Sequence, residues 1–175
     1  MKKNILLIIF VSLVAILARF LPHLPNFSPF YSLLLFSGVY SAHKKYLLIP
    51  LLALFFSDFF LGFYHLGVMI SVYLSFALIF LLGKAYKKQK NILNLASVSL
   101  GSALLFFLLT NWAVWYFGSW YSSNWSGLIL SYQLAIPFFK STLFSTLLYN
   151  GLLFGVYEAS RYFLTRKKPV LASQK

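Results

Sequence analysis

The sequence predicts an all-α integral membrane protein: a bundle of six transmembrane helices with both termini in the cytoplasm and a short second helix. The first observation is composition, because 61% of the 175 residues are hydrophobic and 10% are charged, a balance that soluble domains do not show. The second observation is a series of six apolar segments, and the third is the distribution of basic residues between them. Together they predict one transmembrane domain over residues 1–165 and a cytoplasmic polar tail over residues 166–175.

The basic residues orient the chain, because Lys and Arg resist translocation across a membrane. Thirteen of the fifteen Lys and Arg residues lie within residues 1–4, 42–45, 84–90 and 161–175. The alternate connections, near residues 21–29, 63–66 and 118–137, contain none. This alternation predicts a multi-pass protein of the bacterial cytoplasmic (inner) membrane whose basic clusters contact anionic lipids on the cytoplasmic side. The clusters form no continuous basic face, so we expect no nucleic acid partner.

The apolar segments give the expected helices in order. The first covers about residues 4–20. It resembles a signal peptide, but cleavage after Ala18 would need a small residue where Ile16 stands, so we expect a retained helix. The second, about residues 29–41, would be roughly 18 Å long as a helix, which is shorter than the bilayer core of about 30 Å. The remaining four cover about residues 46–63, 66–82, 92–117 and 138–163.

Two uncharged connections carry further information. Residues 21–29 are fairly apolar and contain three prolines. Irregular backbone at membrane depth persists where protein or a cavity surrounds it. Two interpretations stay open: a loop that dips inward and roofs an outer cavity, and an ordinary surface loop. Residues 118–137 contain two Trp and two Tyr, which predicts a position at the membrane–water boundary and a short interfacial helix over residues 126–136, ended by Pro137.

Asp58 is one of two acidic residues in the chain and lies inside the third apolar segment. An ionisable group at that depth costs a few kcal/mol unless it is paired or hydrated, which makes it a functional candidate. Arg19 and Lys140 are the two bases outside the cytoplasmic clusters, and either could reach it. His65, seven residues later, would share its face if the helix continued that far. The cluster could bind a solute or could be a structural ion pair.

A polar and aromatic patch lies near the outer end of the fifth segment. Asn111 and Trp115 are four residues apart and share a helix face. Aromatic residues of the following connection extend this patch. The patch suits an outward-opening pocket for a flat, largely apolar solute, and it equally suits an interfacial aromatic belt.

The remaining polar residues indicate no catalysis. Glu158 and Arg161, three residues apart, predict an ion pair, and Asn150 predicts a hydrogen bond between helices. Three scattered His and two acidic residues provide no metal cluster, and the chain has no Cys. We find no nucleophile–base–acid set and no Gly-rich phosphate loop. We therefore expect no enzyme and no cofactor.

Several phrases resemble a family of small uncharacterised bacterial six-helix membrane proteins. They are RFLPHLPNFSP (19–29), LLFSGVY (34–40), PLLALFFSD (50–58), TNWAVW (110–115), the run 127–140 ending in PFFK, and LFGVYE (153–158). This family is distantly similar to the S-components of energy-coupling factor (ECF) vitamin transporters. That resemblance implies an outer solute pocket, and a coupling protein and ATPases as partners. One departure is that many S-components dock through small residues four apart on the first helix, whereas Ala15 and Ala18 are three apart.

The resemblance also implies a binding site. By position, it would draw on Asn26, Asp58, His65, Asn111, Trp115 and Lys140. The expected function is a membrane-embedded subunit that binds a small, vitamin-like or aromatic solute for uptake. The alternative is a structural or accessory subunit of a larger membrane complex with no ligand of its own. The two functions predict different surroundings for Asp58. In a solute-binding subunit, Asp58 should face a cavity shared with Asn111. In a structural subunit, it should be buried against a base.

Overall fold

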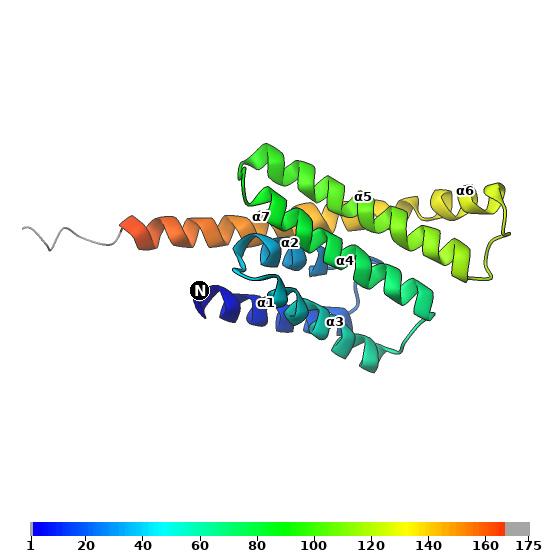
Figure 1. Cartoon of the computed structure of the whole chain (residues 1–175), viewed down its shortest axis with the longest axis horizontal. Coiled ribbons are helices and arrows are strands. Elements are labelled where there is room, and N and C mark those ends of the chain that lie inside the picture. The colour runs from blue at the N-terminus through cyan, green and yellow to red at the C-terminus, as the bar shows by residue number, and fades with distance from the viewer. Residues whose placement is uncertain (1, 167–175) are drawn as a thin grey trace, which may run out of the picture.

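The protein is an all-α bundle in a computed structural model that describes residues 2–166, and the side chains of residues 4–164 (Figure 1). The elements are α1 (Lys2–Phe20), α2 (Phe30–Tyr40), the 3-10 helix η1 (Lys44–Leu47), α3 (Leu48–Leu61), α4 (Leu66–Tyr86), α5 (Ile92–Phe117), α6 (Trp125–Leu134) and α7 (Ile136–Arg166). This part of the chain contains no strand, so the all-α prediction is confirmed. Two helices, α4 and α5, are long and apolar enough to cross a membrane. Most of the expected polar tail lies outside the described residues.

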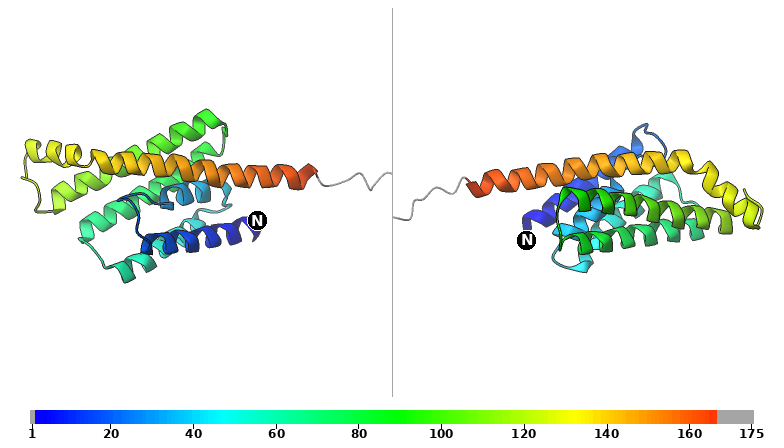
Figure 2. Two further views of the ribbon diagram at one scale, coloured as in Figure 1. Left: turned by 180° about the vertical axis from the view of Figure 1, so that it is seen from behind. Right: turned by 90° about the horizontal axis from the view of Figure 1, so that it is seen from above.

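The helices α1 to α5 run alternately up and down, and α6 leads into α7 in the same general direction, so most connections gather at two ends (Figure 1). The α1–α2, α3–α4 and α5–α6 connections share one end. We call it the uncharged end because these connections contain no Lys, Arg, Asp or Glu. The N-terminus and the α2–η1 and α4–α5 connections share the other, the basic end. Figure 2 shows that α7 runs past the other helices at the basic end.

The break between α6 and α7 differs from the predicted one. Pro137 was expected to end the interfacial helix, yet α6 ends at Leu134 and Pro137 is the second residue of α7. A proline in the first turn of a helix loses no hydrogen bond, because that backbone N–H has no partner within the helix. Pro137 therefore begins the last helix instead of ending the one before it.

The short helix α2 forms the centre of the bundle. Ten of its 11 residues are buried, and it packs chiefly against α4 and α7. The hydroxyl of Ser32 donates to the carbonyl oxygen of Thr146 in α7 at 3.1 Å. The helix has no polar face, so its stability comes from being enclosed on all sides.

Two glycines bring α2 and α4 into backbone contact. A Cβ atom on Gly38 would lie 2.1 Å from the carbonyl oxygen of Phe80, and one on Gly83 would lie 2.3 Å from that of Leu35. Small residues at such a crossing let two helix backbones approach closely, which is common between membrane helices. The closest packing in the bundle core therefore depends on the absence of two side chains.

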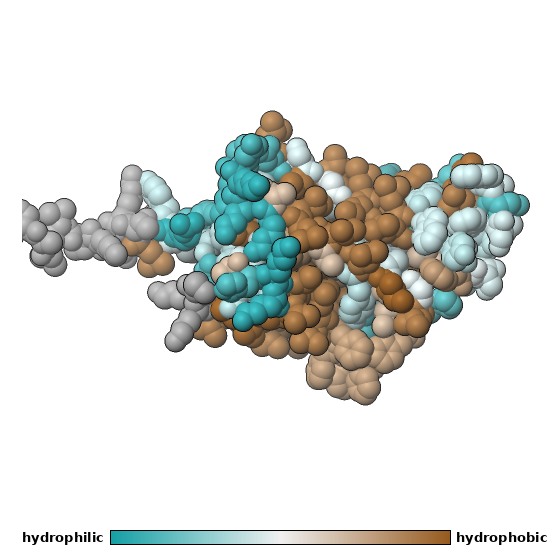
Figure 3. Space-filling model, viewed as in Figure 1, coloured by the Kyte–Doolittle hydropathy of each residue, from teal (hydrophilic) through white to brown (hydrophobic). Residues whose placement is uncertain are grey.

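The distribution of apolar side chains is inverted relative to a soluble protein. Large apolar side chains cover the outside of α1 and α3, where Phe59 is 63% exposed. Buried hydroxyls such as those of Ser75 and Thr146 donate to the carbonyl four residues earlier, which satisfies them inside their own helix. The predicted interhelical hydrogen bond of Asn150 is confirmed, because its Nδ2 donates to Ser99 Oγ at 2.7 Å. Figure 3 shows the result, a hydrophobic middle zone between a strongly hydrophilic end and a paler, weakly polar end around α6.

Candidate functional site

Asp58 lies at the centre of a polar cluster that joins α1, α3 and α4. It is 1% exposed, and its Oδ1 lies 2.7 Å from Nη1 of Arg19. The same Nη1 donates to Ser57 Oγ at 2.6 Å, whereas its contact with Oδ1 is an ion pair without hydrogen-bond geometry. The hydroxyl of Tyr73 donates to Asp58 Oδ2 at 2.9 Å. The buried acid therefore has a base on one oxygen and a hydroxyl on the other.

Arg19, not Lys140, is the base that pairs with Asp58. Lys140 is exposed on α7, and α7 packs chiefly against α2 and α5. Asp58 is not among the residues that line the adjacent cavity, whereas the side chain of Arg19 is 22% exposed and forms part of its wall. As a structural residue, Asp58 was expected from the sequence to be buried against a base, and this is the arrangement observed. The side chain that faces open space is that of its partner, Arg19.

The cavity beside Arg19 has a volume of about 260 Å³. Arg19 contributes from α1, Asn26 from the α1–α2 connection and Tyr64 from the α3–α4 connection. Tyr31 of α2 and Phe106 of α5 form the opposite wall. The space thus lies between the pair α1 and α3 and the rest of the bundle, at the uncharged end.

Two further cavities adjoin the first. One, of about 350 Å³, shares Asn26, Val72 and Phe106 with it and adds Asn111 and apolar residues of α6 and α7. Another, of about 290 Å³, shares Val68, Val114 and Trp120 with that second cavity and is lined by His65 as well. The uncharged end is therefore hollowed by a series of neighbouring spaces, polar near Arg19 and mostly apolar elsewhere.

The α1–α2 connection borders these spaces and contains a tight turn. The N–H of Phe27 donates to the carbonyl oxygen of Leu24 at 2.9 Å, with Pro25 second and Asn26 third in the turn. Asn26 has a positive φ of 59°. Proline followed by a residue with positive φ is the pattern of a type II turn, and Asn tolerates that conformation better than most residues. The turn places Asn26 at the boundary of two cavities, although residues 21–26 are all exposed, as expected for a surface loop.

The six residues assigned from the sequence are not brought together as one set. Asn26 and Asn111 line the same cavity, and Nδ2 of Asn111 also donates to the carbonyl oxygen of Phe107 at 2.8 Å. His65 lines the adjoining cavity. Asp58 and Trp115 stand outside the cavity walls, as does Lys140.

The helix of Asp58 does not continue as far as His65, so the condition under which the two would share a helix face is not met. α3 ends at Leu61, and Gly62 follows with a φ of 96°, a conformation in which other residues are strained. His65 instead caps α4, because its Nδ1 accepts from the N–H of Gly67 at 3.2 Å. Its ring stacks on that of Phe117 with centroids 5.6 Å apart.

The α5–α6 connection is fixed by hydrogen bonds and places one cavity wall. Nε1 of Trp115 donates to the carbonyl oxygen of Ser122 at 3.0 Å, which explains why this indole is engaged outside the cavities. Asn124 caps α6 by accepting from the N–H of Gly127 at 2.9 Å. Between these anchors lies Trp120, which lines two of the cavities.

Removing the cap of α6 should loosen this connection. We expect Asn124→Ala to lower the free energy of unfolding by about 1 kcal/mol, since an N-cap of this kind is worth roughly 0.5–2 kcal/mol. Unfolding of the purified protein in detergent measures the loss. Asn124→Asp, which keeps the acceptor oxygen, is the control and should stay close to the wild type. Equal stability of the alanine variant would contradict the assigned cap.

Sequence reasoning missed the groups that complete the cluster around Asp58. Tyr73 lies on the next helix, and no spacing in the sequence links it to Asp58. Ser57 is adjacent to Asp58, and its hydroxyl also donates to the carbonyl oxygen of Leu54 at 2.7 Å. A serine beside a buried acid was the one local signal available.

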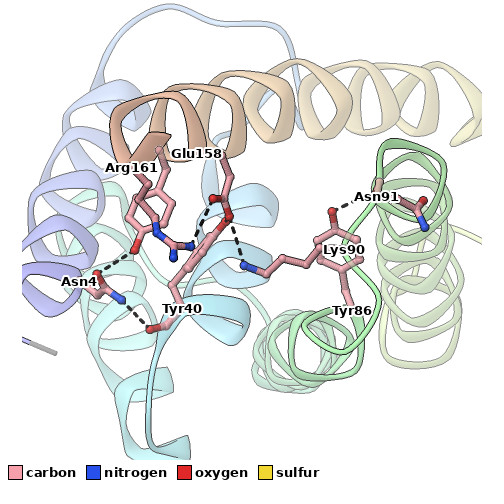
Figure 4. A network of polar contacts seen from close by, with 8 residues as sticks. Asn4, Tyr40, Tyr86, Lys90, Asn91, Glu158 and Arg161 are labelled. Atoms are coloured by element: carbon pink, nitrogen blue, oxygen red, sulfur yellow. Dashed lines mark hydrogen bonds and ion pairs between the residues drawn. The ribbon is translucent and has the colours of Figure 1, made fainter. Parts of the chain in front are cut away.

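A second polar network lies at the basic end (Figure 4). Glu158 accepts from the hydroxyl of Tyr40, from Lys90 at 3.2 Å and from Arg161 at 3.3 Å, so the ion pair with Arg161 predicted from the sequence is confirmed. Asn4 of α1 joins the same network by donating to the carbonyl oxygen of Tyr40 at 3.1 Å. These contacts tie α1, α2, the α4–α5 connection and α7 together at the end opposite Asn26 and His65, and Tyr40, Lys90 and Glu158 also line a separate cavity of about 500 Å³ there.

Comparison with known proteins places the chain in a family. No curated protein and no solved structure matches it. A family model matches residues 1–170, which is nearly the whole chain. The chain therefore belongs to the family of unknown function DUF6580.

Proposed function

We propose that the chain crosses the bacterial cytoplasmic membrane six times, through α1, α2, α3, α4, α5 and α7, with α6 at the outer interface. The hydrophobic middle zone supports this, as do the basic residues at one end and the Trp and Tyr residues at the other (Figure 3). With the basic end in the cytoplasm, both termini lie inside and the lysines contact anionic lipids. The short α2 fits because protein, not lipid, surrounds it.

A topology experiment can use the natural absence of cysteine as its background. We expect Ser122→Cys, at the uncharged end, to react with a membrane-impermeant maleimide added to intact spheroplasts. Lys88→Cys, at the basic end, should react after the membrane is permeabilised. Labelling of Lys88→Cys in intact spheroplasts would contradict the orientation.

We further propose that the protein is a membrane-embedded solute-binding subunit, similar to the S-components of ECF transporters, for uptake of a small, vitamin-like or aromatic molecule. The observation that carries this proposal is the series of adjoining cavities at the uncharged end, bordered by Asn26 and Asn111. Concave, mostly apolar spaces with a few polar groups are typical of small-molecule sites. A coupling protein and ATPases would supply the energy. The proposed role is binding rather than catalysis, and it involves no nucleic acid.

Native mass spectrometry of the protein purified in mild detergent tests this function. The wild type should carry a discrete small-molecule adduct. Val72→Phe fills the boundary between two cavities and should reduce adduct occupancy at least about tenfold. Val156→Phe is the matched control, because Val156 is 65% exposed on α7, and it should retain the adduct. Loss of the adduct in both variants, or in neither, would contradict binding in these cavities.

One observation favours a second candidate, a structural or accessory subunit of a larger membrane complex. Asp58 has the buried ion pair that this alternative requires. In that case the same preparation would contain no adduct and would instead hold other membrane proteins in a fixed ratio.

A further inference from the structure

We propose that the solute carries an anionic oxygen-bearing group, such as a carboxylate, and that the guanidinium of Arg19 receives this group. The inference rests on the proposed solute-binding function and narrows the chemical class of the solute. Asp58 would then act as a positioning residue, which holds Arg19 from behind and makes no contact with the solute.

The charges of the residues that line the cavities favour an anionic solute. Arg19 is the one permanently charged side chain among the described residues that line the three adjoining cavities. The two titratable imidazoles on these walls, His23 and His65, can add only positive charge. Of the two acids, Asp58 lies outside the cavity walls and Glu158 lies at the basic end. The cavities therefore present a cation and no anion to a solute.

Several N–H donors of Arg19 have no acceptor in the described part of the protein, which also favours an anionic solute. A guanidinium has five N–H donors in a planar fork. Both polar contacts of Arg19, with Ser57 and Asp58, are made by Nη1. No described residue accepts from its Nε or Nη2, although the side chain is mostly buried and faces a cavity of about 260 Å³. Neither atom is among the buried polar atoms that lack a partner, so both reach open space and are free to donate to an acceptor that a solute brings.

The support behind Arg19 explains how the empty protein tolerates this arrangement. Asp58 balances the charge of the guanidinium, and Tyr73 occupies the second oxygen of the carboxylate at 2.9 Å. The ring of Phe30 lies under the guanidinium, with its centroid 5.9 Å from Cζ. The fork is thus held on one side and open on the other. A pre-positioned arginine binds a carboxylate with little loss of side-chain entropy, and its fork matches that group in shape.

The cavity shape places the rest of the solute. From Arg19 the space continues past Phe106 and Val72 into the second cavity. There it meets apolar side chains such as Val114 and Phe138. A solute whose anionic group lies at Arg19 would therefore place a largely apolar remainder in the second cavity, toward Asn111. A cationic solute would find no carboxylate on these walls and would face the N–H donors of Arg19, so it is disfavoured.

The test uses the full chain in detergent and a deproteinised extract of small bacterial metabolites, separated by ion exchange into anionic, neutral and cationic fractions. Each fraction is offered to the washed protein, and adducts are recorded by native mass spectrometry. Two variants are compared. Asp58→Asn leaves Arg19 charged, whereas the double variant Arg19→Gln with Asp58→Asn removes both charges and leaves no buried ion unpaired.

The wild type and Asp58→Asn should take an adduct from the anionic fraction, and the double variant should bind it at least about tenfold more weakly. An adduct from the neutral or cationic fraction alone would overturn the inference and leave the proposed function standing. Equal binding of the anionic adduct by the double variant would also overturn it. No adduct from any fraction would overturn the solute-binding function itself.

A second variant keeps the test decisive if the double variant does not fold. Arg19→Lys retains the charge and loses the planar fork, so it should bind the anionic adduct severalfold more weakly. Unchanged affinity in Arg19→Lys would contradict recognition by the guanidinium.

Discussion

Replacing Arg19 with alanine should lower the free energy of unfolding by about 3–5 kcal/mol, the usual loss when one partner of a buried ion pair is removed. The carboxylate of Asp58 would keep one hydrogen bond, from Tyr73, and would have no base beside it. Asp58 is 1% exposed, and water entering from the cavity beside Arg19 would replace only part of the lost interaction with the guanidinium. Unfolding of the purified protein by SDS in mixed micelles would measure the loss.

Two controls separate this effect from the loss of side-chain packing. The double variant Arg19→Gln with Asp58→Asn removes both charges together, so it should lose much less stability than Arg19→Ala. Lys140→Ala removes an exposed base and should change the stability by less than about 0.5 kcal/mol. Equal losses for Arg19→Ala and the double variant would mean that the charge of Asp58 does not matter.

Gly38→Ala should be among the most destabilising single-methyl additions in the protein. The new Cβ would lie 2.1 Å from the carbonyl oxygen of Phe80 and 3.0 Å from the Cα of Gly83. Both atoms belong to backbone, so neither can move aside as a flexible side chain would. Separating α2 from α4 should cost about 1–3 kcal/mol or more, and Gly38→Leu should prevent folding. Thermal unfolding and the yield of monodisperse protein in detergent would report both outcomes.

Gly151 provides the matched control for this prediction. It lies within α7, and a Cβ built there meets nothing within 4 Å. Gly151→Ala should leave the stability unchanged or raise it by about 0.5–1 kcal/mol, because glycine is unfavourable inside a helix. Similar losses at Gly38 and Gly151 would show that the α2–α4 contact has no special role.

The sequence was sufficient to predict the approximate positions of the α-helices, because apolar segments are encoded locally. The segments expected at residues 66–82 and 92–117 correspond to α4 (Leu66–Tyr86) and α5 (Ile92–Phe117). The short central segment was also recognised, because prolines and a basic pair bound it. The segment expected at about residues 46–63 extends two residues beyond the end of α3 at Leu61, since the conformation of Gly62 is not visible in an apolar run.

The candidate site could be predicted only in part, because its residues meet through tertiary contacts. Asp58 was found because a charge in an apolar segment needs a partner, and Arg19 was one of two candidates. The choice between Arg19 and Lys140 depends on the packing of α1 against α3, which no local pattern encodes. The hydroxyl of Tyr73 is 15 residues from Asp58 in sequence and one of 12 tyrosines, so composition could not select it.

The enclosed position of α2 has a consequence for how the protein is made. The helix has 11 residues and touches α7, whose Thr146 accepts from Ser32 across 114 residues of sequence. In the proposed membrane setting, α2 leaves the ribosome long before the helix that covers it has been synthesised. Its final place is therefore taken late, after nearly the whole chain has been inserted. A chain released before α7 would leave one side of α2 open in the bilayer, a defect that membrane proteases can detect.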